Sequence, residues 1–186
     1  MLFVDDFSRF TWIFPLKNKS DVFKDFESFV KTQFQCQIKS FHSDWGGEFQ
    51  KLHPYLKQQG IVHRITCPYT HEQNGLAERK ISHIIDTDLT LLAHAFIPFK
   101  YWSYAFLHAV LTINQMPNTS LKNKIPFEIL YNKSPDYIES KVFGCTVYPY
   151  LRPYNKNKFS FCTYQCVYLG HSPTHHGNLC LDVAKN

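Results

Sequence analysis

Along this chain, segments whose hydrophobic positions have the spacing of a β-strand alternate with segments whose hydrophobic positions have the spacing of an α-helix. Near the start, aromatic and β-branched residues at 3–4 and 10–16 flank a polar segment at 5–9, which predicts a strand, a turn and a second strand. Ser20 is a candidate N-cap for a following helix. Three-to-four spacing predicts that one face of this helix enters a core, through Val22, Phe23, Phe26, Phe29 and Val30.

The same alternation continues to residue 116. Short strands are predicted at 38–43 and 61–66, on either side of a short helix at 52–59 that Gly60 ends. A long helix begins at Leu76, and its predicted core face holds Ala77, Ile81, Ile84, Ile85, Leu89 and Leu92. A further helix opens at Pro98 and ends near 116–117. Alternating strands and helices indicate an α/β layer domain over residues 1–116.

The pattern of hydrophobic and polar residues changes after residue 116. Residues 117–140 contain three prolines and many polar side chains, which predicts a linker with one helical turn around 127–130. Short strands are then predicted at 142–143, 145–150, 159–161 and 166–169, with turn residues between them. Residues 141–186 are therefore expected to form a small β module.

Charge is unevenly distributed over the chain. The formal net charge is +5, and residues 94–186 hold all of it, with nine Lys or Arg against four Asp or Glu. A basic half suggests a polyanionic partner such as nucleic acid, the alternative being a solvated surface. No apolar run reaches the ~18 residues of a membrane helix, and the start has no signal-peptide pattern. The expectation is an intracellular chain that is neither secreted nor bound to a membrane.

The six cysteines are spread along the chain, and without a secretory signal we expect reduced thiols. One group has the ligand types of a zinc site: Cys162, Cys166, His171 and His175. The alternative is that Cys166 packs as a small buried thiol in an alternating strand, and the pattern around it favours this alternative.

Two carboxylates stand at distinctive places. Asp44 ends a predicted strand beside the Gly46-Gly47 break, and Glu78 lies in the first turn of the long helix. Such side chains can converge on one cleft and hold Mg²⁺, which accepts one or two protein carboxylates and keeps water and phosphate as its other ligands. Two such ions can hold the attacking and leaving oxygens of a phosphoryl displacement. The alternative is that Asp44 ends a strand at a turn and Glu78 favours the helix dipole.

Four segments together resemble a known family. They are 4–9 (VDDFSR), 43–49 (SDWGGEF), 68–80 (PYTHEQNGLAERK) and 142–145 (VFGC), and in order and spacing they are similar to the integrase region of copia-type LTR retrotransposon Pol polyproteins. The resemblance implies an α/β ribonuclease-H-like integrase core with a mixed sheet and flanking helices, followed by a small SH3-like β module. It maps the partial core to 1–116, the linker to 117–140 and the module to 141–186.

The resemblance also implies a chemistry. Integrases of this type use an Asp-Asp-Glu triad to hold two Mg²⁺ or Mn²⁺ ions and join the 3′-hydroxyl ends of element DNA to phosphodiesters of target DNA. Asp44 matches the second Asp and Glu78 the Glu, so both are expected to be catalytic and to bind metal. The family's first Asp and first strand lie upstream of segment 4–9, and Asp5 and Asp6 instead match a hairpin, where they are expected to form a buried polar cluster.

The chain is accordingly expected to be an N-terminally truncated integrase fragment, inactive alone and prone to fold poorly, and whether it is an enzyme is left open. The alternative is a non-catalytic nucleic-acid-binding remnant of a decayed element, and the motif register disfavours a nuclease. Element and target DNA are the expected partners, with a homo-oligomer on DNA and a nuclear site of action. DNA contacts are expected from two groups: Tyr69, Gln73, Asn74, Arg79 and Lys80 beside Glu78, and Arg152, Lys156 and Lys158 in the β module.

Those last three cations alternate with aromatic residues at 148, 150, 154, 159 and 161. Rings and cations together are typical of a nucleic-acid contact. The alternative is that the aromatic side chains form the core of the β module while the lysines keep it soluble.

Overall fold

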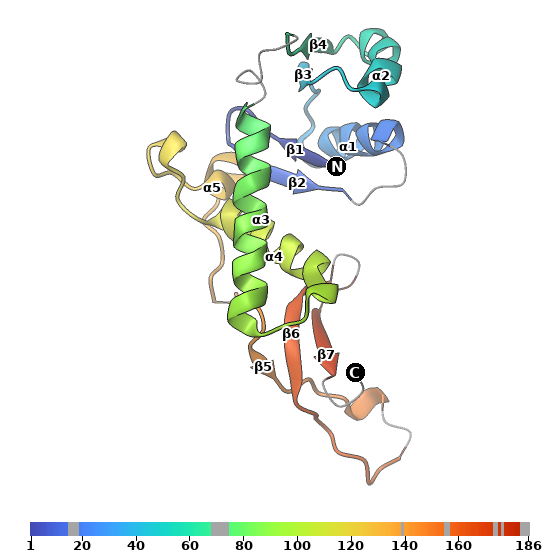
Figure 1. Cartoon of the computed structure of the whole chain (residues 1–186). Coiled ribbons are helices and arrows are strands. Elements are labelled where there is room, and N and C mark those ends of the chain that lie inside the picture. Colours follow the sequence, from blue (N-terminus) through green and yellow to red (C-terminus); the bar gives the residue numbers. More distant parts are fainter. Residues whose placement is uncertain are drawn as a thin grey trace. The chain divides into compact units, whose positions relative to one another are not determined.

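The computed structural model describes residues 1–14, 19–67, 75–138, 140–154, 157–172, 175 and 177–182. It contains two compact units (Figure 1). The first comprises Met1–Val4 and Thr11–Ile81, and the second comprises Asp5–Phe10 and Ser82–Asn186. The boundaries predicted near residues 116 and 140 remain predictions from the sequence.

Two pairs of short strands form the sheets of the first unit (Figure 1). β1 (Leu2–Val4) and β2 (Thr11–Ile13) are antiparallel, as the predicted hairpin requires. β3 (Ser40–Ser43) and β4 (Val62–Ile65) are parallel. In the described part of the chain the two pairs are separate two-stranded sheets. Both pairing directions of the expected mixed sheet therefore occur in this unit, each in its own two-stranded sheet.

Two helices cover these strands: α1 (Lys19–Phe34) and α2 (Gly47–Gln58). α2 begins five residues before its predicted start at residue 52, because the Gly46 carbonyl already accepts hydrogen bonds from Phe49 and Gln50. The aromatic rings of β1 and α1 interlock, and those of Phe3 and Phe26 stack with centroids 4.0 Å apart. The buried core of this unit consists of Phe3, Val22, Phe23, Phe26, Leu52, Leu56 and Ile61.

A buried carboxylate joins α1 to α2. Glu27 is 2% exposed, and its Oε2 accepts a hydrogen bond of 2.7 Å from the Tyr55 hydroxyl. Lys31 Nζ lies 2.7 Å from the other carboxylate oxygen. The hydrogen bond to Glu27 and burial raise the pKa of Tyr55. Both oxygens of Glu27 therefore have a partner, so its burial leaves no carboxylate oxygen unsatisfied.

The long helix α3 (Gly75–Ala95) buries a different face from the one predicted. Ile81, Ile85 and Leu89 are 41–47% exposed. Its buried row consists of Lys80, Ile84, Asp88 and Leu92. Successive residues of an α-helix are rotated by about 100°, so a row that starts one residue earlier faces a different direction. The prediction is confirmed for Ile84 and Leu92 and wrong for the three exposed residues, because Lys80 and Asp88 occupy the rest of the buried row.

The second unit packs helices against a small sheet. α4 (Trp102–Gln115) follows the 3₁₀ turn at Phe99–Tyr101 and ends at Met116, as predicted. α5 (Pro126–Tyr131) is the helical turn expected near residue 127. Within this unit, the ring of Phe10 contacts the rings of Phe127 and Tyr131.

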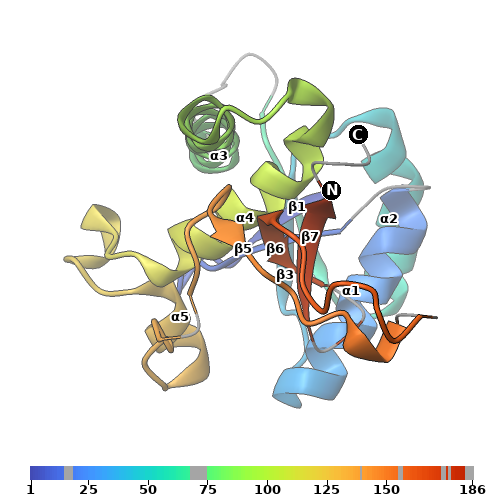
Figure 2. The same cartoon turned by 90° about the horizontal axis from the view of Figure 1, so that it is seen from below.

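The sheet of the second unit has three antiparallel strands in the order β5-β6-β7, seen side by side in Figure 2. They are β5 (Thr146–Val147), β6 (Cys166–His171) and β7 (Asn178–Asp182). α4 packs on β6, and the cluster between helices and sheet contains Leu92, Ala105, Phe143 and Leu169. The predicted strand at 166–169 is confirmed. Those at 142–143 and 159–161 are wrong, and β7 was not predicted.

None of the described helices combines the length and the apolar character needed to cross a membrane.

Candidate functional site

Asp44 stands where the chain leaves β3 and enters α2. Its side chain is exposed, and its Oδ1 accepts a hydrogen bond of 3.2 Å from the Gly46 N–H. A Cβ on Gly47 would meet no atom within 4 Å, so the backbone at the start of α2 is open to an approaching group. The local geometry therefore presents a carboxylate beside an accessible helix start.

The residue after Asp44 has a strained backbone. Trp45 has a φ of +58°, a left-handed conformation that L-residues other than Gly, Asn and Asp rarely adopt. Its carbonyl accepts a hydrogen bond of 3.2 Å from Gln50 Nε2. Its ring lies 5.5 Å from the ring of His53 and 5.7 Å from that of His63, between centroids. Trp45 thus contacts both α2 and β4.

The residue before Asp44 belongs to a chain of hydrogen bonds. Ser43 is buried, and its Oγ lies 2.8 Å from His63 Nε2. The other nitrogen of the same ring, Nδ1, lies 3.0 Å from His53 Nδ1. Burial and the neighbouring His53 lower the pKa of His63. This network connects β3, β4 and α2 next to Asp44.

Sequence reasoning missed this network. Its members, Ser43, His53 and His63, are ten residues apart and come from three elements, so no helical or strand periodicity links them. The parallel register of β3 and β4, which pairs Ser43 with Ile65 and Phe41 with His63, brings two of them together. Only knowledge of that register would have predicted the contact.

Glu78 lies in the first turn of α3 and is exposed, as its predicted role requires. Arg79 is also exposed, and a Cβ on Gly75 would lie 2.9 Å from Arg79 Nη1, so the guanidinium folds back over the start of the helix. Lys80 is only 9% exposed. Burial does not favour the phosphate contact predicted for Lys80, which stays a prediction from the sequence.

Asp44 and Glu78 have suitable chemistry for a hard cation but do not complete a metal site. Carboxylate oxygens are the ligands that Mg²⁺ and Mn²⁺ prefer. Over the described ranges, however, no group of three or more Asp, Glu, His or Cys side chains could hold a metal ion. The described residues thus offer two of the carboxylates that the resemblance implies, and the structure does not assemble them into a full set.

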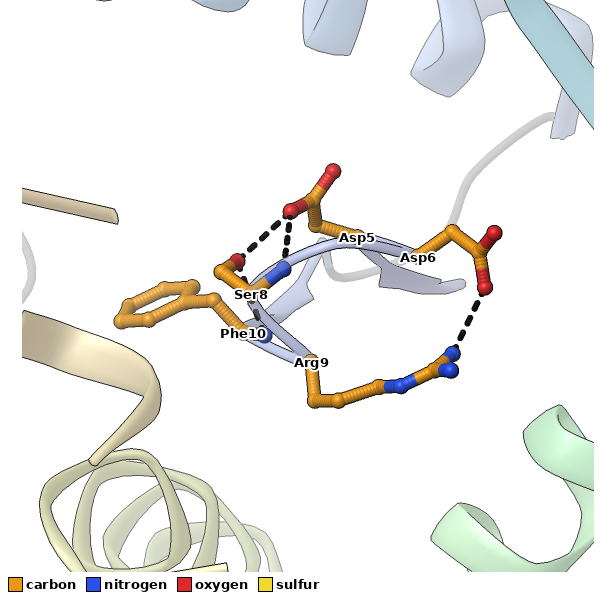
Figure 3. A network of polar contacts seen from close by, with 5 residues as sticks. All are labelled: Asp5, Asp6, Ser8, Arg9 and Phe10. Carbon is orange, nitrogen blue, oxygen red and sulfur yellow. Dashed lines mark hydrogen bonds and ion pairs between the residues drawn. The ribbon is translucent and has the colours of Figure 1, made fainter. Parts of the chain in front are cut away.

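Asp5 organises the turn between β1 and β2 (Figure 3). One of its oxygens, Oδ2, accepts hydrogen bonds of 2.7 Å from both the N–H and the hydroxyl of Ser8. Asp6 points away from this cluster and pairs with Arg9 at 2.6 Å, with 88% of its side chain exposed. The predicted polar cluster is confirmed for Asp5, but the predicted burial of Asp6 is wrong because Arg9 stabilises its carboxylate at the surface.

The remaining predicted DNA contacts fall into two groups. Tyr69, Gln73, Asn74 and Lys156 lie outside the described residues. Arg152 and Lys158 are exposed. The aromatic side chains among them are exposed as well, between 64% for Tyr148 and 97% for Phe159, so the alternative in which they form the core of the β module is wrong.

Cys166 is buried in β6, which confirms its interpretation as a packed thiol. Arg152 Nη1 lies 3.1 Å from the Sγ of Cys162, and His171 is exposed.

Two solved structures share this fold. The chain is similar to the HTLV-2 integrase catalytic core domain in complex with magnesium (trimeric form), with a TM-score of 0.50 and 19% identity over 69% of this chain and 81% of that one. It is also similar to the simian T-cell lymphotropic virus intasome in complex with PP2A regulatory subunit B56 gamma, with a TM-score of 0.55 and 15% identity over 97% of this chain and 69% of that one. The fold is therefore that of the ribonuclease-H-like integrase cores, and the β5-β6-β7 sheet is consistent with a small β module.

In sequence, the chain is 49% identical over 186 residues to the retrovirus-related Pol polyprotein from transposon RE1 of Arabidopsis thaliana, covering 98% of this chain and 13% of that protein. It is 31% identical to the Pol polyprotein from transposon TNT 1-94 of Nicotiana tabacum, over 98% of this chain and 14% of that protein. No family model matches. The chain thus spans about an eighth of the curated relatives it matches, and it resembles the integrase-like region of copia-type retrotransposon Pol polyproteins.

Proposed function

We propose that this chain is the part of a retrotransposon Pol polyprotein that acts on DNA in strand transfer, joining element 3′-hydroxyl ends to phosphodiesters of target DNA. The observation that carries the proposal is the 49% identity to a stretch of the RE1 Pol polyprotein over 98% of this chain. The integrase fold of the solved neighbours supports it.

Asp44 and Glu78 are the proposed catalytic and metal-binding residues. Both carboxylates are exposed and lie at the end of a strand and the start of a helix, from which a hard cation can be reached. When bound, a pair of Mg²⁺ or Mn²⁺ ions would stabilise the charge that develops on the oxygens of the reacting phosphodiester. Two carboxylates are fewer than a two-ion site needs, so the chain alone is expected to be inactive.

Exposed cations form the proposed DNA contacts. Arg79 lies beside Glu78, and Arg152 and Lys158 lie in the second unit, each with a side chain that can reach a phosphate. The loop residues Tyr69, Gln73 and Asn74 remain predicted contacts, as does Lys156. A homo-oligomer assembled on DNA and a nuclear site of action complete the proposal.

A second candidate is a non-catalytic nucleic-acid-binding remnant. The specific observation in its favour is that the described residues hold no complete group of metal ligands. Both candidates bind DNA, so they differ only in whether Asp44 and Glu78 still bind a metal ion.

The test uses the purified 186-residue chain in two assays. In the first, titration with Mn²⁺ compares wild type with Asp44→Asn and Glu78→Gln, with Asp86→Asn, an exposed carboxylate of α3, as the matched control. Weaker binding in the first two variants alone supports the catalytic proposal, and equal binding in all of them supports the remnant.

The second assay joins a blunt oligonucleotide to plasmid DNA in Mg²⁺ or Mn²⁺. We expect binding of duplex DNA that weakens as salt rises, without joining. Joining that disappears in Asp44→Asn would show that the chain is active by itself and overturn the expected inactivity. Absence of duplex binding at low salt would overturn both candidates.

A further inference from the structure

A ribbon of the second unit carries exposed aromatic side chains. Residues 148–154 follow β5, and residues 157–164 precede β6 (Figure 1). Tyr150 pairs with Thr163 in an antiparallel bridge, and the N–H of Leu151 donates a hydrogen bond of 2.7 Å to the Cys162 carbonyl. We refer to residues 148–154 and 157–164 as the aromatic ribbon.

The pairing puts several rings on one face of the ribbon. Side chains two residues apart on a strand point the same way, and diagonal neighbours across an antiparallel pair share a face. Tyr148 and Tyr150 therefore face the same side as Phe161. Leu151 and Cys162 take the opposite side and are half-buried. These three rings therefore lie on one side of the ribbon.

The exposure of these rings is unusually high. Phe159 is 97% exposed, Tyr154 82% and Phe161 77%. Each apolar ring left in water forgoes the free energy that burial provides, and grouped exposed apolar side chains commonly mark a binding surface. The aromatic ribbon therefore has the character of a contact surface.

The charge of the ribbon selects the chemistry of its partner. Arg152 and Lys158 are exposed, and Arg152 Nη1 also lies 3.1 Å from the Sγ of Cys162. The sequence contains no Asp or Glu from residue 140 to residue 164. Cations without acidic neighbours favour a polyanionic partner. In a nucleic-acid contact, aromatic rings stack on bases and cations neutralise phosphates.

We propose that the aromatic ribbon binds unpaired nucleotides, with its rings stacked on bases and Arg152 and Lys158 at phosphates. This rests on the proposed function for the identity of the partner and adds which form of nucleic acid the ribbon takes. In a duplex the faces of the bases are covered by neighbouring base pairs, and only their edges reach the grooves. Freely exposed rings suit the open faces of unpaired bases.

The test measures binding of the whole chain to three labelled probes of equal length by fluorescence anisotropy. They are a thymidine single strand, an abasic single strand and a duplex. We expect the thymidine strand to bind about tenfold or more tightly than the abasic strand, because only the former offers bases for stacking. A uridine strand of RNA tests the same chemistry with a 2′-hydroxyl, and its relative affinity decides between DNA and RNA as the source.

Variants then locate the contact. Tyr154→Ala with Phe159→Ala is expected to lower the affinity for the thymidine strand about tenfold or more while leaving duplex binding unchanged. Both side chains are solvent-exposed, so the fold is expected to persist, which circular dichroism checks. The matched control is Phe96→Ala, which removes a ring that is 94% exposed outside the ribbon.

Three results would overturn the inference: equal affinity for base-bearing and abasic strands, an equal loss in Phe96→Ala, or self-association of the chain that the ribbon variant abolishes. The last would identify a second copy as the occupant. Failure of the proposed function can be told apart from failure of this inference. If the proposed function is wrong, duplex binding is lost as well. If duplex binding remains but unpaired bases are not preferred, only this inference is overturned.

Discussion

His53 Nδ1 lies 3.0 Å from His63 Nδ1, so the two imidazoles share one hydrogen bond between α2 and β4. One ring must donate and the other accept, which requires that at least one of them be neutral. His63 also contacts Ser43 through its other nitrogen. Protonation of both rings would therefore break the hydrogen bond that joins α2 to β4 next to Asp44.

The first prediction concerns acid stability. Because burial and His53 lower the pKa of His63 below its ordinary value of 6.5, the unfolded chain binds more protons than the folded chain just below that pH. The contribution of His63 to the free energy of unfolding is therefore fully present above pH 6.5 and is lost as the pH drops through the lowered pKa. In urea unfolding at about pH 7.5 and about pH 5, His63→Gln is expected to lose less stability on acidification than wild type.

His42→Gln is the matched control, since this exposed imidazole lies on the neighbouring strand β3. It should keep the wild-type loss. His108 has its pKa lowered by burial and by His171, and contributes a loss of the same sign, so some acid sensitivity persists in His63→Gln. An acid loss in His63→Gln as large as in wild type would contradict the prediction.

A second prediction follows from Asp88, which is 4% exposed and whose Oδ1 has no hydrogen-bond partner among the described residues. Burial raises the pKa of this carboxyl, so the folded chain holds its proton more tightly than the unfolded chain. Ionisation of Asp88 therefore lowers the free energy of unfolding as the pH rises from the ordinary pKa through the raised pKa. At neutral pH, Asp88→Asn is expected to raise the free energy of unfolding by about 1 kcal/mol.

The gain should shrink toward the ordinary pKa of 3.8, where wild type is protonated as well. Urea unfolding at neutral and acid pH measures both values. Asp86→Asn, an exposed carboxylate of the same helix, should change stability by no more than about 0.5 kcal/mol. Destabilisation by Asp88→Asn at neutral pH would show that the carboxylate has a stabilising partner.

The same helix shows where sequence reasoning succeeds and where it fails. Its presence and its start, to within one residue, follow from local periodicity, and they are confirmed. Its buried face depends on what the helix packs against, and Lys80 and Asp88 are buried against expectation. Hydrophobicity alone favours the row containing Ile85 and Leu89, because it has no information on which neighbours surround each side of the helix.

The candidate site shows the same limit. Asp44 and Glu78 could be proposed because each lies in a contiguous motif, 43–49 or 68–80. The contacts of Ser43 and His53 with His63 depend on tertiary structure and leave no local pattern. β7 escaped prediction for a related reason, since a short strand is stabilised by its pairing with β6 more than by its own propensity.

A third prediction contrasts two glycines with positive φ. Gly144 has a φ of +79°, and a Cβ there would lie 2.2 Å from Ala95 Cβ. Gly60 has a φ of +71° and open space around it. Gly144→Ala combines backbone strain with a clash, and is expected to cost about 2–4 kcal/mol. Gly60→Ala should cost only about 1 kcal/mol from strain. Equal losses in thermal or urea unfolding would mean that the end of α3 moves aside easily.

The fourth prediction separates strain from packing at Trp45. Its left-handed backbone costs about 1 kcal/mol for a residue with a Cβ, while its ring gains contacts with His53 and His63. Trp45→Ala loses the ring and keeps the strain, whereas Trp45→Gly loses the ring and relieves the strain. We therefore expect both variants to be less stable than wild type, with the Gly variant about 1 kcal/mol more stable than the Ala variant.

The order of the three proteins in urea unfolding checks this reasoning. A Trp45→Ala variant as stable as Trp45→Gly would show that the turn relaxes out of the left-handed region once the ring is gone, so that the ring itself imposes the conformation. In that case the two histidines hold the backbone next to Asp44 through the Trp45 ring, and His63→Gln should loosen the turn as Trp45→Ala does. Amide hydrogen exchange at Trp45 and Gly46 measures that loosening directly, because protection there reports local opening of the turn.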